Sequence, residues 1–288
     1  MKLALGTAQF GMKYGLSNAV GKVPQIEAQK MLNFALNHSI DLLDTAISYG
    51  SSEECLGRTG VTGFKVVTKL PPIPDSCENI YPWVEKQIAA SKSRIGVDAF
   101  YGLLLHKASD LNGAKASELY TALDSHRKSG EIQKIGISIY SPQELDLINE
   151  KFSIDIVQAP FNLIDRRLHT SGWLGKLKKR GIEVHARSIF LQGLLLMPLI
   201  NIPSRFNRWK HLWTCLDHWR IESGVSAIKA CISFPRQFEG IDRLIVGATS
   251  VRELREITNA FDHDFIGPFP DIDISDEMLV NPSNWNSL

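Results

Sequence analysis

Short apolar runs recur along the chain, and each ends at a glycine or a polar residue. Eight of them predict β-strands: Leu3–Gly6, Ile40–Leu43, Lys65–Thr68, Phe100–Leu105, Lys134–Ile137, Asp155–Gln158, Ile182–Ala186 and Arg243–Val246. Segments of helical period lie between the strands, for example Ile26–Asn37, Trp83–Ser93, Glu118–Ser129 and Val251–Ala260, and Pro142 favours a helix that begins near Ser141. Strands that alternate with helices in this way predict an α/β fold, a single (β/α)8 TIM barrel with its active site at the C-terminal ends of the strands.

The chain has 288 residues and no low-complexity linker or charge block that would mark a boundary, so one barrel domain over 1–288 is favoured over two smaller domains. An insertion at about 198–224 interrupts the alternation of strands and helices before the last strand. It contains Trp209, Trp213 and Trp219 among charged residues. We interpret it as an amphipathic helix packed on the barrel; the alternative is a loop that covers a ligand. The irregular tail, about 265–288, can cross a barrel mouth.

Composition and charge narrow the class of protein. The chain is 44% hydrophobic and 22% charged, and its net charge of +1 argues against a nucleic-acid partner. The basic run Lys176–Arg180 has helical spacing and is interpreted as the solvated face of a surface helix. Four cysteines without CxxC spacing fit free thiols in a reducing compartment. No segment resembles a signal peptide or a membrane span, so we expect a cytoplasmic protein with no membrane partner.

Four side chains with reactive groups lie at or just beyond consecutive predicted strands. Asp44 follows the second strand, Tyr49 lies on the loop beyond it, Lys69 follows the third strand and His106 the fourth. Because these strands are neighbours and barrel chemistry gathers at their carboxyl ends, the four groups are expected to converge. Taken singly, each has a plainer interpretation, such as a capping aspartate, a packing aromatic or a surface lysine.

Such a cluster has the parts that carbonyl reduction by hydride requires. A tyrosine has an ordinary pKa of about 10 and is a weak acid at neutral pH. A nearby ammonium is expected to lower that pKa, and a carboxylate fixes the ammonium in place. An imidazole beside them can donate a hydrogen bond to a carbonyl oxygen. Together the groups would protonate an oxygen as negative charge develops on it.

The segments LGTAQFG, LLDTAISYGSSEECLG, VVTKL and LLLHKASD resemble the aldo-keto reductase superfamily in their order and spacing. Farther along, IQKIGISIY, DIVQAPFNLID, ARSIFLQGLLL and LIVGATSVRELREI look like the family's later strand ends, so the resemblance runs from about Leu3 to Asn259. It implies an NAD(P)H-dependent reductase that transfers hydride to an aldehyde or ketone. It also implies a catalytic tetrad of Asp44, Tyr49, Lys69 and His106 with Tyr49 as proton donor, a small-molecule carbonyl substrate, and a monomer or small homo-oligomer.

The resemblance favours NADP(H) as the cofactor and leaves NAD(H) open. The residues that it implies for cofactor binding are Gly6, Thr7, Ala8, Asp44, Ser138, Gln158, Arg187, Ser188, Phe190, Gln192, Leu194, Gly247, Ala248, Thr249, Ser250, Glu253 and Glu256. The turn at 247–250 leads into the helix predicted at Val251–Ala260. It favours an anion independently of the resemblance, because a helix N-terminus presents free N–H groups.

This chain departs from the family pattern at three positions in or beside this set. Ile139 cannot hydrogen-bond a carboxamide, and Arg187 stands where many relatives stack an aromatic ring on the nicotinamide. Glu253 stands where many have Arg or Gln facing the 2′-phosphate, and it would repel a phosphate unless Arg252 or Arg255 offsets its charge. This third departure is the reason that NAD(H) stays open.

Other classes stay open at this stage. A regulatory subunit of aldo-keto reductase type, with little turnover, keeps the same tetrad. A metal-dependent barrel hydrolase would use His106, His185 and Asp44, although the chain has no HxH or HExxH pair and no metal is expected. For the substrate, Arg205 and Arg208 near the expected barrel mouth favour a polar or anionic carbonyl compound.

Overall fold

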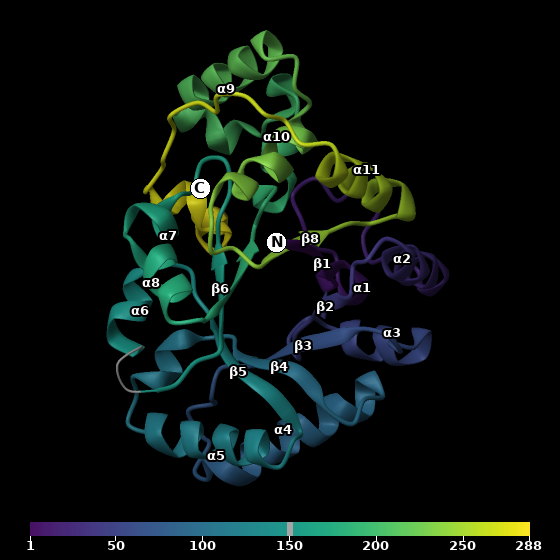
Figure 1. Ribbon diagram of the computed structural model, residues 1–288, viewed down its shortest axis with the longest axis vertical. Coiled ribbons are helices and arrows are strands. Elements are labelled where there is room, and N and C mark those ends of the chain that lie inside the picture. The colour runs from purple at the N-terminus through teal and green to yellow at the C-terminus, as the bar shows by residue number, and fades with distance from the viewer. Residues whose placement is uncertain (149–151) are drawn as a thin grey trace.

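Eight parallel strands form a closed barrel in the computed structural model, which describes residues 1–148 and 152–288 (Figure 1). Each strand pairs with the next along the chain, and β8 closes the barrel on β1, with Gly6 opposite Gly247. The strands are β1 (Lys2–Gly6), β2 (Leu42–Asp44), β3 (Lys65–Leu70), β4 (Phe100–Leu105), β5 (Ile132–Ser138), β6 (Ile156–Pro160), β7 (Glu183–Arg187) and β8 (Arg243–Gly247). The TIM-barrel prediction is confirmed, and each predicted strand lies within two residues of an observed one.

The helices lie outside the strands (Figure 1). They are α1 (Ala8–Gly11), α2 (Gln25–Asn37), α3 (Ser52–Thr59), α4 (Ile80–Ile95), α5 (Ala116–Lys128), α6 (Gln143–Ile148), α7 (Arg167–Thr170), α8 (Trp173–Lys179), α9 (Lys210–Glu222), α10 (Ala227–Ser233), α11 (Val251–Asp262) and α12 (Glu277–Val280). The helix expected near Ser141 begins at Gln143. The basic run forms α8, in which Leu177 is buried while Lys176 and Lys178 are exposed, as predicted.

Apolar side chains fill the barrel on both sides of the strands. One buried cluster occupies its interior: Ala4, Leu42, Val67, Leu104, Ile156 and Ile245. A much larger cluster lies between the strands and the surrounding helices. Parallel strands that are buried on both faces read as continuous apolar runs, which explains why the strands are detectable in the sequence. This rigid scaffold fixes where each strand ends, and therefore where the polar side chains beyond it lie.

The insertion before β8 packs as a helix, which confirms the first of its two interpretations. Its helix α9 buries Trp213, whose indole N–H donates to the Phe206 carbonyl at 3.1 Å. The C-terminal tail runs along α9 (Figure 1), where the Trp219 indole N–H donates to the Pro268 carbonyl at 3.0 Å, and Glu277 of α12 pairs with Arg167 of α7 at 3.0 Å. Trp285 of the tail packs edge-on against Phe206, with ring centroids 4.9 Å apart. The insertion and the tail therefore share a second apolar core outside the barrel.

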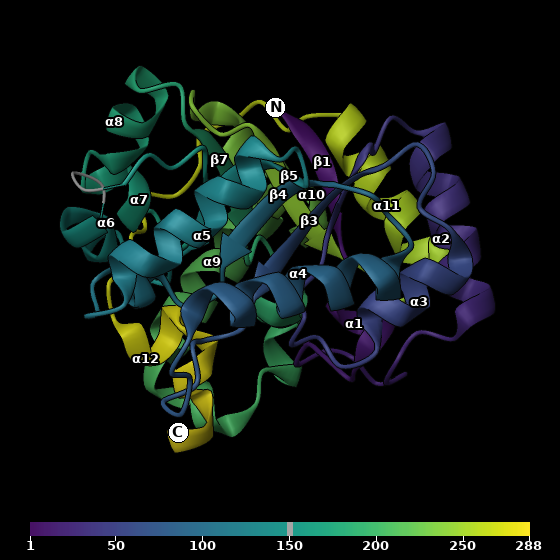
Figure 2. The ribbon, with the colours of Figure 1, turned by 90° about the horizontal axis from the view of Figure 1, so that it is seen from below.

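The two ends of the chain mark the two ends of the barrel. In Figure 2 the N-terminus, where β1 begins, lies at the top, and α12 and the C-terminus lie at the bottom. The tail is therefore at the end where the strands finish. Among the helices of residues 1–148 and 152–288, none is long and apolar enough to cross a membrane.

Candidate active site

A buried ion pair joins the ends of β2 and β3. The Lys69 ammonium, fully buried, donates to both carboxylate oxygens of Asp44 at 2.8 Å and to the Thr45 carbonyl at 2.8 Å. The Gln158 amide from β6 donates to Asp44 Oδ1 at 2.7 Å. Burial lowers the pKa of Lys69, and the Asp44 charge acts against that shift. The pair is held in one geometry because each charge has several partners.

Tyr49 lies over this pair, with the Lys69 ammonium 5.1 Å from the centroid of its ring. The expectation that Lys69 lowers the pKa of Tyr49 is wrong for this state of the protein. Burial raises that pKa and Asp44 raises it further, while the charge of Arg187 acts in the opposite direction. The three N–H groups of Lys69 already have partners, so Tyr49 is a neutral phenol at pH 7 and keeps its proton.

His106, directly after β4, packs against the ring of Tyr49. The two rings are T-shaped, with centroids 5.8 Å apart and planes 80° apart. The Nδ1 atom of His106 is hydrogen-bonded to Ser48 Oγ at 2.9 Å. Burial, followed by the charges of Lys69 and Arg187, lowers the pKa of His106 to about 4, although Asp44 acts in the opposite direction. The imidazole is therefore neutral at pH 7, and its Nε2 atom is left for another partner.

The titration midpoint of His106 is accordingly expected near pH 4 in the folded protein, against an ordinary value of about 6.5. Because the folded-state pKa is the lower one, protonation favours the unfolded chain, and stability is lost as the pH falls from about 6.5 towards 4. NMR titration of histidine side chains measures the midpoint, with His106→Asn to assign the signal. A midpoint at or above 6.5 would contradict the desolvated position described here.

A cavity of about 510 Å³ opens beside the pair and runs from the end of β2 to α11. Its lining includes the following predicted residues: Gly6, Thr7, Ala8, Asp44, Tyr49, Gln158, Arg187, Ser188, Phe190, Gln192, Gly247, Ala248, Thr249, Glu253 and Glu256. This volume lies in the ordinary range for a ligand site, which is about 300–1,000 Å³. The structure thus brings most of the residues expected around a cofactor to one cavity.

The loop after β7 has an unusual backbone where it lines this cavity. Leu191, Gln192 and Gly193 all have positive φ, at 45°, 53° and 91°. Left-handed backbone is costly for residues with a side chain, so an ordered run of it points to a functional constraint. A side chain at position 193 is also excluded, because its Cβ would lie 2.0 Å from Ser17 Oγ.

A second loop, after β1, covers the same cavity and was not anticipated. It contributes Gly15, Ser17, Asn18, Ala19 and Val20, and it is joined to the β7 loop by the Leu16 N–H, which donates to the Gln192 carbonyl at 2.8 Å. The side chain of Asn18 organises the loop by bonding to the backbone of Tyr14 and Gly21. The glycines in YGLSNAVG signalled a turn in the sequence, but nothing in it signalled contact with the β7 loop.

The end of the cavity at α11 is acidic. The Thr249 N–H donates to Glu253 Oε2 at 2.7 Å, and Ser250 caps the helix by accepting from the Glu253 N–H. Arg252 pairs with Glu256 at 3.2 Å, and Arg255 lies over the ring of Phe34. Within the described residues, neither arginine pairs with Glu253.

Several predicted residues lie outside the cavity lining. Lys69 and His106 contact the ring of Tyr49 but do not line the cavity, Ser138 is buried at the end of β5, and Ser250 caps α11. Arg187 lines the cavity, but its guanidinium stacks on Tyr140, with Cζ 4.4 Å from the ring centroid, and donates to the Ile139 carbonyl at 2.8 Å.

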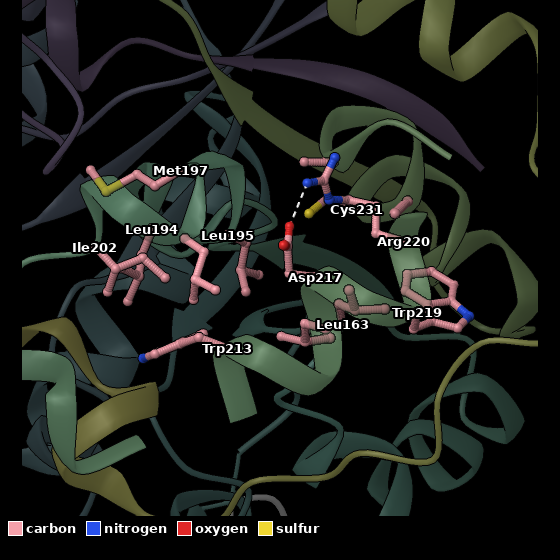
Figure 3. A pocket seen from close by; sticks show the side chains of 14 residues that line it. Leu163, Leu194, Leu195, Met197, Ile202, Trp213, Asp217, Trp219, Arg220 and Cys231 are labelled. Carbon is pink, nitrogen blue, oxygen red and sulfur yellow. Dashed lines mark hydrogen bonds and ion pairs between the residues drawn. The ribbon is translucent and has the colours of Figure 1, made fainter. Parts of the chain in front are cut away.

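Leu194 lines a different hollow of about 40 Å³ beneath the insertion (Figure 3). The walls there are mostly apolar, with Trp213 and Cys231 among them, and the polar exception is the ion pair between Asp217 and Arg220. None of the four reactive residues lines this hollow, so Leu194 lies apart from the cavity beside Tyr49.

Two further interpretations of the sequence concern residues outside this cavity: a metal site that includes His185, and a substrate site that includes Arg205 and Arg208. His185 is fully buried, and its Nε2 atom bonds to Glu183, 3.3 Å away and on the same strand. Within residues 1–148 and 152–288, no three His, Cys, Asp or Glu side chains are arranged to hold a metal ion.

At the mouth, Arg208 pairs with Asp276 of the tail at 2.7 Å, and Arg205 lies over Phe206. Neither arginine lines the cavity, and the polar or anionic substrate stays a prediction.

A parallel barrel with a buried Lys–Asp pair, a tyrosine and a histidine at its strand ends defines an oxidoreductase-like site. Residues 2–267 match the model of the aldo/keto reductase family, and the chain belongs to this family. Carbonyl reduction is therefore the class of reaction that its membership supports, and members of the family generally bind NAD(P)H.

Named relatives agree with this family. The chain is 27% identical over 295 residues to an L-glyceraldehyde 3-phosphate reductase of Escherichia coli, covering 88% of this chain and 84% of the relative. It has the fold of the aldo-keto reductase AKR11C1 from Bacillus halodurans, solved in its holo form, with a TM-score of 0.72, 18% identity, and coverage of 92% and 88% of the two chains. For the glycerol dehydrogenase AKR11B4 from Gluconobacter oxydans the TM-score is 0.69 at 20% identity, with coverage of 92% and 87%.

Proposed function

We propose that this protein is an NAD(P)H-dependent reductase of aldehydes or ketones in which Tyr49 is the proton donor. The observation that carries the proposal is the position of a neutral, desolvated tyrosine over a buried Lys69–Asp44 pair, with the His106 ring packed against it. The test is turnover of the purified protein with NADPH and NADH against a panel of aldehydes and ketones. Cofactor binding without any turnover would favour the regulatory-subunit interpretation instead.

The residues of the cavity fit a nicotinamide dinucleotide. The cavity is long enough to pass from Tyr49 to α11, and the glycines at positions 6, 193 and 247 line it. Left-handed turns such as that of the β7 loop can form anion-binding concavities from successive N–H groups, and a helix N-terminus favours anions as well. We assign the pyrophosphate to the β7 loop and the adenosine end to the turn before α11.

The bound cofactor would supply the hydride, and the side chains would control the proton. Tyr49 holds its proton at neutral pH because burial disfavours the phenolate. As hydride reaches the carbonyl carbon, negative charge grows on the oxygen, and the Tyr49 hydroxyl donates its proton there. The phenolate that remains has the Lys69 ammonium 5.1 Å from the centroid of its ring. The Nε2–H of a neutral His106 would donate to the same carbonyl oxygen and orient it.

For the cofactor, the acidic end of the cavity supports NAD(H) as the preferred form, although the family resemblance alone favours NADP(H). Glu253 lines this end and has no arginine partner among the described residues. A carboxylate accepts hydrogen bonds from the ribose hydroxyls of NAD and repels the 2′-phosphate of NADP. The same carboxylate bonds to the Thr249 N–H, so it is held in place rather than free to move away.

Replacing Glu253 by arginine is expected to shift the ratio of dissociation constants for NADH and NADPH at least about tenfold towards NADPH, because a guanidinium pairs with phosphate. Fluorescence titration with both cofactors measures this ratio. Glu253→Gln is the matched control, because it removes the charge but keeps an oxygen that can accept the hydrogen bond from the Thr249 N–H. It therefore separates the effect of charge from the effect of losing that bond. It should move the ratio in the same direction by a smaller factor. An unchanged ratio in both variants would mean that the 2′-position lies elsewhere.

A further inference from the structure

The loop before Tyr49 makes a contact that the tetrad does not include. Ser48 Oγ lies 2.9 Å from Nδ1 of His106, although 58 residues separate the two in the sequence. The backbone N–H of His106 donates to the Leu70 carbonyl at 3.1 Å, and that of Ile47 donates to the Lys69 carbonyl at 3.2 Å. The segments after β2 and β4 are therefore both tied to the end of β3, and Ser48 bridges them directly.

The direction of this contact is coupled to what the histidine can do, because a neutral imidazole has one N–H donor and one acceptor, and the Ser48 hydroxyl can either donate to Nδ1 or accept from it. If Ser48 donates to Nδ1, the ring proton must be on Nε2, and Nε2–H can donate to a substrate oxygen. If Nδ1 carries the proton instead, Nε2 is an acceptor and repels a carbonyl oxygen. For metal-bound and catalytic histidines, the bond at one ring nitrogen sets the role of the other.

The surroundings of the ring leave Ser48 as its only side-chain hydrogen-bond partner among the described residues. The ring is T-shaped to that of Tyr49, and the charged groups that act on it are Lys69, Arg187 and Asp44. The two cations oppose protonation of the ring, so His106 does not become a donor at both nitrogens near neutral pH. The donor role of Nε2 then depends on the tautomer.

We propose that Ser48 is a positioning residue for the reaction, which donates to Nδ1 of His106 and thereby holds the neutral imidazole in its Nε2–H tautomer. The catalytic part of this inference rests on the function proposed above, but the tautomer does not. Ser48 itself does not touch the reacting atoms: it acts through His106, whose Nε2–H orients and polarises the carbonyl.

The experiment compares the wild-type protein with Ser48→Ala and Ser48→Thr, without cofactor or substrate. Histidines labelled with ¹⁵N report the protonated nitrogen through long-range ¹H–¹⁵N spectra, and His106→Asn assigns the signal. We expect the Nε2–H tautomer in the wild type and in Ser48→Thr, which keeps the hydroxyl, and a mixture of tautomers in Ser48→Ala. An Nδ1–H tautomer in the wild type, or spectra that are identical in all three proteins, would overturn the proposal.

Kinetics then test the catalytic consequence. The loss of one neutral hydrogen bond corresponds to about 2- to 10-fold in kcat/KM, so Ser48→Ala should fall by about this factor and Ser48→Thr should recover it. The dissociation constant of the cofactor should not change in either variant. A tautomer shift with unchanged kcat/KM refutes the positioning role, whereas no turnover in the wild type, with the tautomer result intact, refutes the proposed function alone.

Discussion

Tyr49→Phe is expected to lower kcat by about 10²- to 10⁴-fold, the usual contribution of a positioned general acid. The substitution removes one oxygen atom, and the ring keeps its contacts with Lys69 and His106. The proton that neutralises the developing alkoxide must then come from water, which is neither positioned nor desolvated. Steady-state rates with NADH or NADPH and a reactive aldehyde measure the effect.

The same variant should bind cofactor as the wild type does, and fluorescence titration checks this directly. Tyr140→Phe is a matched control, because Tyr140 also loses a hydroxyl and lies beside the site through its stacking with Arg187. Its rates should stay near those of the wild type. A Tyr49→Phe enzyme that turns over at the wild-type rate would rule out Tyr49 as the donor.

Lys69→Met is expected to destabilise the fold by about 3–5 kcal/mol, as well as to abolish most of the activity. Methionine nearly matches the length of lysine, but it leaves the Asp44 carboxylate buried with Gln158 as its remaining side-chain donor. An unpaired charge inside the barrel is costly because it is neither hydrated nor neutralised. Chemical denaturation followed by circular dichroism measures the free energy of unfolding.

A double-mutant cycle separates the structural effect from the catalytic one. Asp44→Asn combined with Lys69→Met removes both charges, so we expect it to recover much of the stability but none of the activity. Lys128→Met is the control on the surface, where Lys128 pairs with Asp124 while 78% exposed, and its cost should be below about 1 kcal/mol. Equal costs for Lys69→Met and Lys128→Met would contradict the description of a desolvated pair.

The sequence by itself determined the barrel and the convergence of the four reactive residues. Strands that are buried on both faces leave continuous apolar runs, as in FYGLLL of β4, and these runs are readable without any knowledge of their partners. Asp44, Lys69 and His106 lie at the ends of three consecutive strands, and consecutive strands of a closed parallel barrel are neighbours. Their proximity followed from chain order alone.

Only the tertiary structure decided which partners these residues have. The pKa of Tyr49 depends on burial and on the charge of Asp44, and Arg208 is paired with a tail residue 68 positions away. The bridge between the β1 and β7 loops and the bond between Ser48 and His106 likewise join segments that are distant in the chain. A local pattern records whether a side chain is buried, but hydrogen-bond partners and desolvation depend on what the rest of the fold brings to that place.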